Sequence, residues 1–479
     1  MYLGLDLGTS GVKGIVIADD QRVVAVGHGG LDVSRPHSGW SEQDPADWVR
    51  ATREALAEIS KTQDLSAIQA IGLSGQMHGA TLLDKSDAVL RPCILWNDTR
   101  AHEEAASMDA DPKFRALTGN IVFPGFTAPK LAWVKKNEPE IFDQVAKVLL
   151  PKDYLRFWLS GEHVSEMSDA AGTSWLDVGA RDWSDALLSA TDLNRDHMPT
   201  LVEGQHVSAT LRKDLAEELG MTAGIPIAGG AGDNAAAAMG AGVVQAGQAF
   251  LSLGTSGVLF AANDGYAPDP DTALHTFCHA IQNSWHQMGV ILSATDSLAW
   301  YANLVGSSPE KLSGALDRVS APGRALFLPY LGGERTPHND AKVRGAFLGL
   351  EHVTDTNAGT RAVMEAVAFA IRDSFEAMAA TGTDIVQATA LGGGANSETW
   401  LQIISTALGI PIAIPADGDF GAAFGAARLG MIAASGAGAD LATPPAIKHM
   451  VEPQANLRPE FDAAYKRYKT AYQAIREIS

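Results

Sequence analysis

Two aspartates lie beside glycine-rich turns that are about half a chain apart. Asp6 precedes Gly-Thr-Ser-Gly at residues 8–11, and Asp233 directly follows Gly-Gly-Ala-Gly at residues 229–232. Glycine lets backbone N–H groups converge on an anion, and Thr and Ser hydroxyls add donors without bulk. Carboxylates facing such turns could hold Mg²⁺ beside a polyphosphate or accept a proton from an attacking hydroxyl. Either aspartate could instead be a turn or cap residue. Asp233 is the better candidate for a base, because it lies at the boundary between the two halves of the chain.

The turn after Asp6 occurs twice. Leu-Asp-Leu-Gly-Thr-Ser-Gly at residues 5–11 is repeated almost unchanged as Leu-Ser-Leu-Gly-Thr-Ser-Gly at residues 251–257. One Gly-Thr-Ser-Gly could be an ordinary turn, but two copies, each after an apolar run, predict two related halves that share a phosphate-bearing ligand. Gly-Gly-Gly-Ala-Asn at residues 392–396 could let an adenine or ribose lie against bare backbone. Neither the dinucleotide fingerprint nor a Walker-type loop is present, so the predicted nucleotide fold is of another kind.

Further candidate residues follow predicted strands. Residues 68–73 form an apolar run that leads into Ser-Gly-Gln-Met-His-Gly, and residues 93–96 end in Asn-Asp-Thr-Arg. Polar residues just past a strand's carboxyl end line the ligand crevice of open α/β sheets. His78 could therefore contact a polyol hydroxyl or be a structural histidine, and Trp96 could be a sugar platform or a core residue.

The elements around these candidates alternate between strands and helices. The pattern predicts an amino-terminal meander of three strands, a helix that begins at Pro45 after the N-cap Asp44, and a small-residue helix that closes the first half. In the second half it predicts helices over residues 290–300, 308–319, 360–380 and 421–429, and a closing amphipathic helix whose aromatic stripe is core packing. The loop at residues 332–338 could be a lid or a solvated turn, and we expect no catalytic role there. The predicted domains are residues 1–243 and 244–479.

Composition limits the class of protein. The chain has 479 residues, of which 46% are hydrophobic and 19% charged, as expected for a globular protein of two domains. The net charge of -20 argues against general affinity for nucleic acid or anionic membranes. There is no apolar run long enough to span a bilayer, the start does not resemble a signal peptide, and the two cysteines form no framework. We expect a cytoplasmic protein. The oligomeric state stays open, with a homodimer as one alternative.

Taken together, these motifs resemble the FGGY carbohydrate kinases, over essentially the whole chain. The resemblance is carried by Asp-Leu-Gly-Thr-Ser at the start, Gly-Asp-Asn at residues 232–234, Leu-Gly-Thr-Ser-Gly at residues 253–257 and Gly-Gly-Gly-Ala at residues 392–395. It implies the α/β, two-domain, actin/hexokinase-like (ribonuclease H-like) ATPase fold, with a duplicated βββαβαβα core, a mixed five-stranded sheet in each domain and an interdomain cleft. It also implies ATP and Mg²⁺.

The resemblance assigns roles to particular residues. Asp233 matches the general base, and Asp6 the carboxylate that organises Mg²⁺ and the γ-phosphate; both could bind the metal. The remaining matches are nucleotide-binding positions (Thr9, Ser10, Gly254, Thr255, Gly392, Gly393 and Asn396) and sugar-binding positions (Met77, His78, Asn234 and Trp96).

Within the family, the Gln-Met-His stretch at residues 76–78 is most similar to members that phosphorylate D-xylulose. Phosphorylation of D-xylulose at its terminal hydroxyl is therefore the first hypothesis, as a step of pentose catabolism. The same chemistry on ribulose, fuculose or an alditol is the nearest alternative. An ATPase switch of the actin or heat-shock type, or a catalytically silent sugar sensor, would be a different class of protein. Both are disfavoured, because no peptide-binding or filament insertion is evident and both aspartates are intact.

Overall fold

The computed structural model describes residues 1–416, 418 and 420–478. A seven-stranded sheet forms the centre of the amino-terminal half, in the order β13-β14-β5-β1-β2-β3, and β15 pairs with the end of β5. The first three strands are an antiparallel meander, as predicted, while β5 and β14 run parallel to β1. The strands are β1 (Tyr2–Leu7), β2 (Gly11–Ile17), β3 (Val23–Gly30), β5 (Ala70–Gly75), β13 (Val207–Thr210), β14 (Pro226–Ala228) and β15 (Ala231–Gly232).

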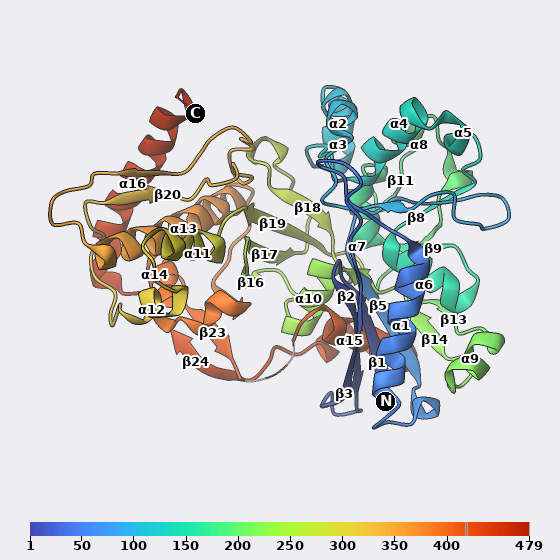
Figure 1. Ribbon diagram of the computed structural model, residues 1–479. Helices are drawn as coiled ribbons and strands as arrows, with labels where there is room; N and C mark the ends of the chain where they lie inside the picture. Colours follow the sequence, from blue (N-terminus) through green and yellow to red (C-terminus); the bar gives the residue numbers. More distant parts are fainter. Residues whose placement is uncertain (417, 419, 479) are drawn as a thin grey trace.

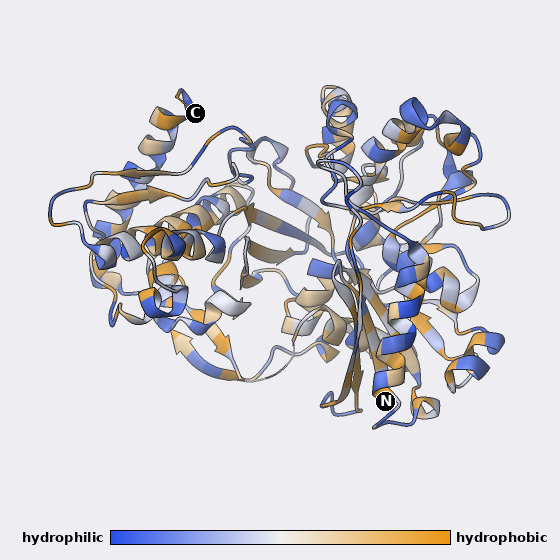
Figure 2. Ribbon diagram, viewed as in Figure 1, coloured by the Kyte–Doolittle hydropathy of each residue, from blue (hydrophilic) through white to orange (hydrophobic). Residues whose placement is uncertain are grey.

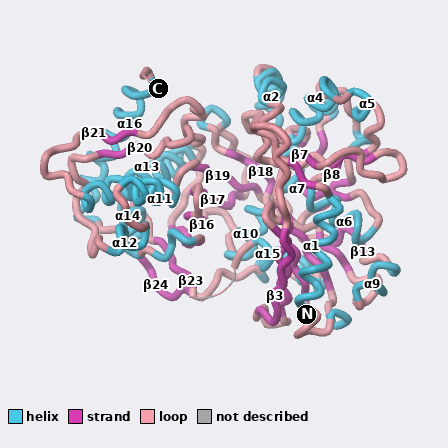
Figure 3. The backbone as a smooth tube through the Cα atoms, viewed as in Figure 1, coloured by secondary structure: helices cyan, strands magenta, loops and turns pink. Residues whose placement is uncertain are grey.

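The second half repeats this topology in another seven-stranded sheet, in the order β18-β19-β17-β16-β22-β23-β24. An antiparallel meander is again followed by two strands parallel to its first strand. The strands are β16 (Gln248–Leu253), β17 (Gly257–Asn263), β18 (His275–Cys278), β19 (Trp285–Ile291), β22 (Gln387–Leu391), β23 (Ile412–Pro415) and β24 (Ile447–Val451). Each sheet thus contains the expected five-strand core with further strands added, so the predicted duplication is confirmed (Figure 3).

Corresponding helices cover the two sheets. A long helix follows the meander in each half, as α1 (Pro45–Ile59) in the first and, after two shorter helices, as α13 (Thr356–Ala380) in the second. The carboxylate of Asp44 caps α1 by accepting the N–H of Ala46, as predicted. Hydrophilic and hydrophobic residues alternate along α1 in Figure 2, because one face packs against β2 and β3 and the other meets solvent.

The two halves meet through a pair of small-residue helices, α10 (Asp233–Ala241) and α15 (Ala422–Ser435). A Cβ atom on Gly425 would lie only 1.8 Å from the carbonyl oxygen of Ala236, so the helix backbones are in direct contact. Although it comes late in the sequence, α15 also packs against β1 and β5 of the first sheet, where Gly4 and Gly72 leave room for its backbone (Figure 1). The predicted division at residues 243–244 falls between the two sheets. As a domain boundary it stays a prediction, because α15 rejoins the first sheet.

A region of short helices and strands, mostly between β5 and β13, extends the first half at the upper right of Figure 1. Its hydrophobic core is continuous with side chains of the second sheet, including Phe260 and Phe277. The elements of this half that lie outside the seven-stranded sheet are β4 (Glu42–Gln43), β6 (Thr81–Leu83), β7 (Cys93–Ile94), α2 (His102–Asp109), α3 (Pro112–Thr118), α4 (Thr127–Asn137), α5 (Pro139–Phe142), β8 (Lys147–Leu149), α6 (Pro151–Ser160), β9 (Val164–Glu166), α7 (Met167–Ala170), β10 (Leu176–Asp177), β11 (Asp182–Trp183), α8 (Asp185–Ser189), β12 (Thr200–Val202) and α9 (Lys213–Leu219).

The prediction of a helix over residues 290–300 is wrong in its first part. There β19 continues to Ile291, which pairs with Gly257 of β17, and α11 (Thr295–Leu304) begins only at Thr295. A short apolar run has no periodicity that separates a strand from a buried helix, so pairing with a distant strand decided the outcome.

The remaining elements are α12 (Pro309–Gly314), β20 (Leu326–Leu328), β21 (Ala346–Leu348), α14 (Glu398–Leu408) and the closing helix α16 (Arg458–Arg476), whose aromatic stripe is buried as expected. Among the described residues, no helix combines the length and apolarity needed to cross a bilayer.

Candidate functional site

The second half contains a cavity of about 920 Å³ beside the third glycine-rich turn. Gly392 and Asn396 line it on one side, and Phe420, Lys448 and His449 on others. Gly392 has φ +85°, and a Cβ atom there would lie 2.8 Å from the oxygen of Leu253, so the chain can make this turn only with glycine. A cavity of this size can hold a nucleoside.

The repeated Gly-Thr-Ser-Gly turn lies at the end of β16 and is fixed by the start of α11. The Thr295 hydroxyl donates to the carbonyl oxygen of Gly254 (2.8 Å), and the Ala294 N–H donates to that of Thr255 (2.8 Å). The side chains of Thr255 and Ser256 remain exposed. The turn is therefore tied to the start of α11, while its hydroxyl groups remain accessible.

The first copy of this turn connects to the sugar-side candidates through Thr9. The Thr9 hydroxyl donates to Oε1 of Gln76 (3.1 Å) and accepts the indole N–H of Trp96 (2.9 Å), and Gln43 donates to the Thr9 carbonyl oxygen (2.7 Å). Trp96 is nevertheless 48% exposed. Ser10 at the tip of the turn is also exposed. Thr9 and Trp96 thus lie together, although they are far apart in the sequence.

The two aspartates lie on neighbouring parts of the first sheet. Asp6, near the end of β1, is opposite Ser74 of β5, and Ser74 is opposite Ala231 of β15 on its other side. With adjacent strands about 5 Å apart, the backbones at Asp6 and Ala231 are roughly 10 Å apart. Asp233 follows two residues later, as the first residue of α10. The described residues contain no group of three or more His, Cys, Asp or Glu side chains arranged to hold a metal. Two carboxylates still suit Mg²⁺, which binds few of them and completes its shell with water and phosphate oxygens.

Asp233 is held in a defined environment. Its carboxylate accepts the backbone N–H of Asn234 (2.7 Å) and the side-chain amide of the same residue (3.0 Å). Burial raises the pKa of Asp233 above its ordinary value, and these hydrogen bonds act in the opposite direction. Met77 packs against the preceding residue, since a Cβ atom on Gly232 would lie 2.9 Å from its sulfur. The structure therefore brings Met77, Asp233 and Asn234 together.

His78 lies next to this group with its ring fixed in orientation. Nδ1 is 2.7 Å from the carbonyl oxygen of Gly172, and the ring stacks on Phe126 at 4.5 Å. Burial, and then the charge of Lys130, lower the pKa of His78 to about 3, so the ring is neutral near pH 7. Since a carbonyl can only accept, Nδ1 carries the proton and Nε2 is an acceptor, suited to a sugar hydroxyl. Lys130 donates to the His78 carbonyl oxygen (2.7 Å) and helps to hold the +69° φ of this residue.

Arg335 also reaches this region, although nothing in the sequence around it indicates such a role. The loop at residues 332–338 is not a solvated turn, because Glu334 and Thr336 are buried. Arg335 reaches the aromatic surroundings of His78: its guanidinium lies 3.9 Å from the ring centre of Phe123 and 3.5 Å from Nε2 of His275. Burial lowers the pKa of Arg335 to about 10, which leaves it charged at neutral pH. An arginine within a Gly- and Pro-containing loop gave no periodic signal that would reveal this contact.

Comparison with known proteins shows which family the chain belongs to. Residues 1–240 match the N-terminal domain of the FGGY family of carbohydrate kinases, and residues 249–434 match its C-terminal domain. The chain is 50% identical to the xylulose kinase of Escherichia coli, over 91% of this chain and 90% of that one. It is 35% identical to that of Bacillus subtilis, over 99% and 96%. A xylulose kinase structure from Rhodospirillum rubrum superimposes with a TM-score of 0.92 at 28% identity, covering 100% of this chain and 99% of that one. The chain therefore belongs to the FGGY family of carbohydrate kinases.

Proposed function

We propose that this carbohydrate kinase transfers the γ-phosphoryl group of ATP to the terminal hydroxyl of D-xylulose, giving D-xylulose 5-phosphate. The similarity to proteins named xylulose kinase supports the substrate. The observation that carries the reaction is the convergence of Asp233, Asn234, Met77 and His78 at one edge of the first sheet.

Asp233 acts as the general base in this proposal. It lies at the amino end of α10, where the helix dipole favours the carboxylate form, and Asn234 fixes one of its oxygens. Burial raises its proton affinity, which suits a group that must take a proton from an alcohol. An ordinary aspartate titrates near pH 4. Because the pKa of Asp233 is raised, the acidic limb of the kcat/KM profile should lie at a higher pH than that. His78 Nε2 accepts a second sugar hydroxyl and thereby orients the first toward Asp233.

The nucleotide lies against the second half. The adenosine would occupy the cavity lined by Gly392 and Asn396, with Gly393 in the same turn, and the turn at Gly254 and Thr255 would receive the phosphates. Asp6 and Asp233 would hold Mg²⁺, which neutralises phosphate charge when bound. Both cysteines of the chain are unpaired, which supports a reducing compartment such as the cytoplasm.

The test is ADP release with ATP and Mg²⁺ against D-xylulose, D-ribulose, L-fuculose, xylitol and glycerol, for the wild type and Asp233→Asn. We expect stimulation by D-xylulose and a loss of turnover in Asp233→Asn of about 10³-fold or more, on the scale of a base that also positions its substrate. Asp355→Asn is the matched control, since Asp355 also lies at a helix amino terminus, as the N-cap of α13, but far along the chain from Asp233. It should turn over normally.

Different outcomes would contradict different parts of the proposal. Stimulation by another sugar would support the phosphoryl transfer but contradict the interpretation of Met77 and His78 as residues specific for D-xylulose. Normal turnover by Asp233→Asn would remove Asp233 as the base. Failure of every sugar to stimulate ADP release would move the chain toward an ATPase switch or a sensor.

A further inference from the structure

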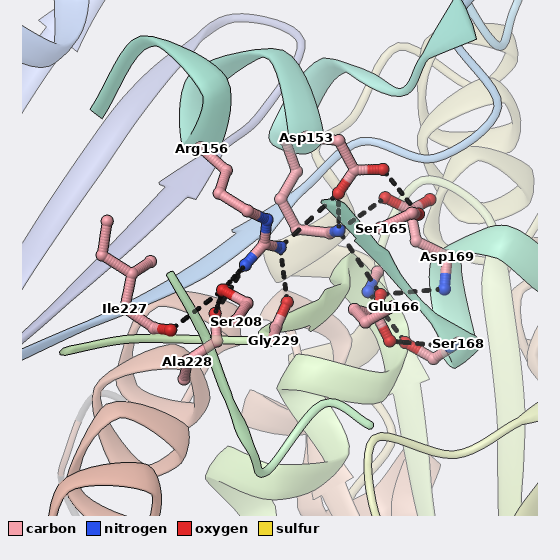
Figure 4. A network of polar contacts seen from close by, with 12 residues as sticks. Asp153, Arg156, Ser165, Glu166, Ser168, Asp169, Ser208, Ile227, Ala228 and Gly229 are labelled. Atoms are coloured by element: carbon pink, nitrogen blue, oxygen red, sulfur yellow. Dashed lines mark hydrogen bonds and ion pairs between the residues drawn. The ribbon is translucent and has the colours of Figure 1, made fainter. Parts of the chain in front are cut away.

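Five charged side chains of the first half are completely buried in one network (Figure 4). Lys152 lies at its centre, with Nζ 2.6 Å from Oδ1 of Asp153, 3.4 Å from Oε1 of Glu166 and 3.3 Å from Oδ2 of Asp169. The fifth charge is Arg156, one turn further along α6 from Asp153. Burying charges is costly, and a buried ion cluster contributes little net stability compared with apolar packing. The position of this cluster therefore needs another explanation.

Arg156 binds the backbone that leads to Asp233. Its guanidinium donates to the carbonyl oxygens of Ala228 (2.6 Å) and Gly229 (2.5 Å) and to the hydroxyl of Ser208 (2.5 Å), which itself donates to the oxygen of Ile227 (2.9 Å). Ala228 is the last residue of β14, and Gly229 follows it directly before the turn at Gly230. Charge-assisted bonds to two successive carbonyls fix the direction in which the chain leaves the sheet.

Ser168 binds the other end of the same segment. Its hydroxyl accepts the N–H of Gly232 (3.0 Å) and donates to Oε2 of Glu166 (2.8 Å). Glu166 is in turn fixed by the backbone N–H groups of Ser168 (2.7 Å) and Asp169 (2.9 Å) and lies close to Lys152. The bond therefore connects the charged network to the residue immediately before Asp233.

The segment of residues 228–232 is thus held at both ends by one rigid, buried cluster. Its middle has little freedom, because a Cβ atom on Gly230, where φ is +76°, would lie 2.2 Å from the oxygen of Leu73. The next residue after this segment is Asp233, and a base must lie within hydrogen-bond reach of its proton donor. An error of about 1 Å in such a position can cost about 100-fold in rate.

We propose that Ser168 and Arg156 are positioning residues, which fix the carboxylate of Asp233 for proton abstraction through the backbone of residues 228–232. This inference rests on the proposed role of Asp233 as the base. Neither side chain needs to touch the sugar or the nucleotide. Their loss should therefore lower kcat and leave the KM values for sugar and ATP nearly unchanged.

The test compares Ser168→Ala and Ser208→Ala with Thr191→Val. The Thr191 hydroxyl is also buried, accepts an N–H (from the Trp175 indole, 2.9 Å) and donates to a carbonyl (Leu188, 2.9 Å), but lies outside the network. We expect a fall in kcat of about 10- to 100-fold for Ser168→Ala. Ser208→Ala removes only one of the hydrogen bonds of Arg156, so its kcat should fall less, by about 3- to 10-fold. Both KM values should stay within about 3-fold of the wild type. Thr191→Val should lose about as much thermal stability as Ser168→Ala and keep the kcat of the wild type.

The outcomes separate this inference from the proposed function. Wild-type kcat in Ser168→Ala and Ser208→Ala, with Asp233→Asn inactive, would overturn the positioning role and keep the base. An equal fall in kcat for Thr191→Val would show a general loss of stability and would also overturn it. Normal turnover by Asp233→Asn would instead remove the base itself.

Discussion

Gly425→Ala tests whether contact between α10 and α15 fixes the active end of α10. The added methyl carbon would lie 1.8 Å from the oxygen of Ala236 and 2.8 Å from the nitrogen of Gly240. Both atoms belong to the backbone, so no side-chain rotation can relieve the clash. Since non-bonded heavy atoms prefer about 3.5 Å, the two helices must separate by about 1.5 Å or more.

The size of the effect follows from that displacement. Overpacking a rigid contact typically costs about 1–3 kcal/mol, and a clash with two backbone atoms belongs at the upper end, near 3 kcal/mol. Asp233 is the first residue of α10 and would move with it, so kcat should fall by about 100-fold. The control is Gly436→Ala at the carboxyl end of α15, where φ is +69° and no atom lies within 4 Å. Backbone strain alone should cost about 1 kcal/mol there.

The measurements are the urea midpoint by tryptophan fluorescence and the kcat for D-xylulose. We expect a fall in the free energy of unfolding at least twice as large for Gly425→Ala as for Gly436→Ala, and a loss of kcat only in the former. Equal midpoints and equal kcat values for the two variants would refute the reasoning, because they would show that the helix contact can relax without moving α10.

Two further predictions concern buried groups. Arg428 on α15 donates to the carbonyl oxygens of Met239 (2.8 Å) and Gly240 (3.1 Å), so Arg428→Met should destabilise the protein by about 2–3 kcal/mol, measured by urea unfolding; an unchanged midpoint would show that these carbonyls find other partners. Burial raises the pKa of the Cys93 thiol to about 11 and that of Cys278 to about 12, so neither should react with a thiol reagent in the native protein at pH 8, whereas both should react in urea. Rapid labelling of either in the folded state would contradict the burial of these side chains.

Local signals in the sequence were reliable where the structure depends on residues close in the chain. Asp44 caps α1, as the pattern predicts. The repeated Gly-Thr-Ser-Gly turn indicated the duplicated topology, because each copy ends the first strand of its sheet. The pattern failed only in the first part of residues 290–300, where pairing of β19 with β17 outweighed helical propensity.

The candidate site was predictable only in part, for the same reason. Asp6 and Asp233 can be recognised in the sequence because each lies beside a glycine turn. Their closeness in space depends on how β1 and β15 pair with β5, which involves distant segments of the chain. Arg335 reaches the surroundings of His78 from the second half, and nothing near it in the sequence indicates that partner.

By itself, the sequence determined the residue types that could do chemistry, the repeat, the cap that begins α1 and the resemblance to a family of kinases. Only the tertiary structure decided that α15 returns to the first sheet and that Arg156 and Ser168 bind the backbone before Asp233. Caps and turns form between residues a few positions apart, so neighbouring residue types are enough to predict them. Small residues such as Gly425 signal that some backbone comes close, but which backbone it is depends on the packing of the whole chain.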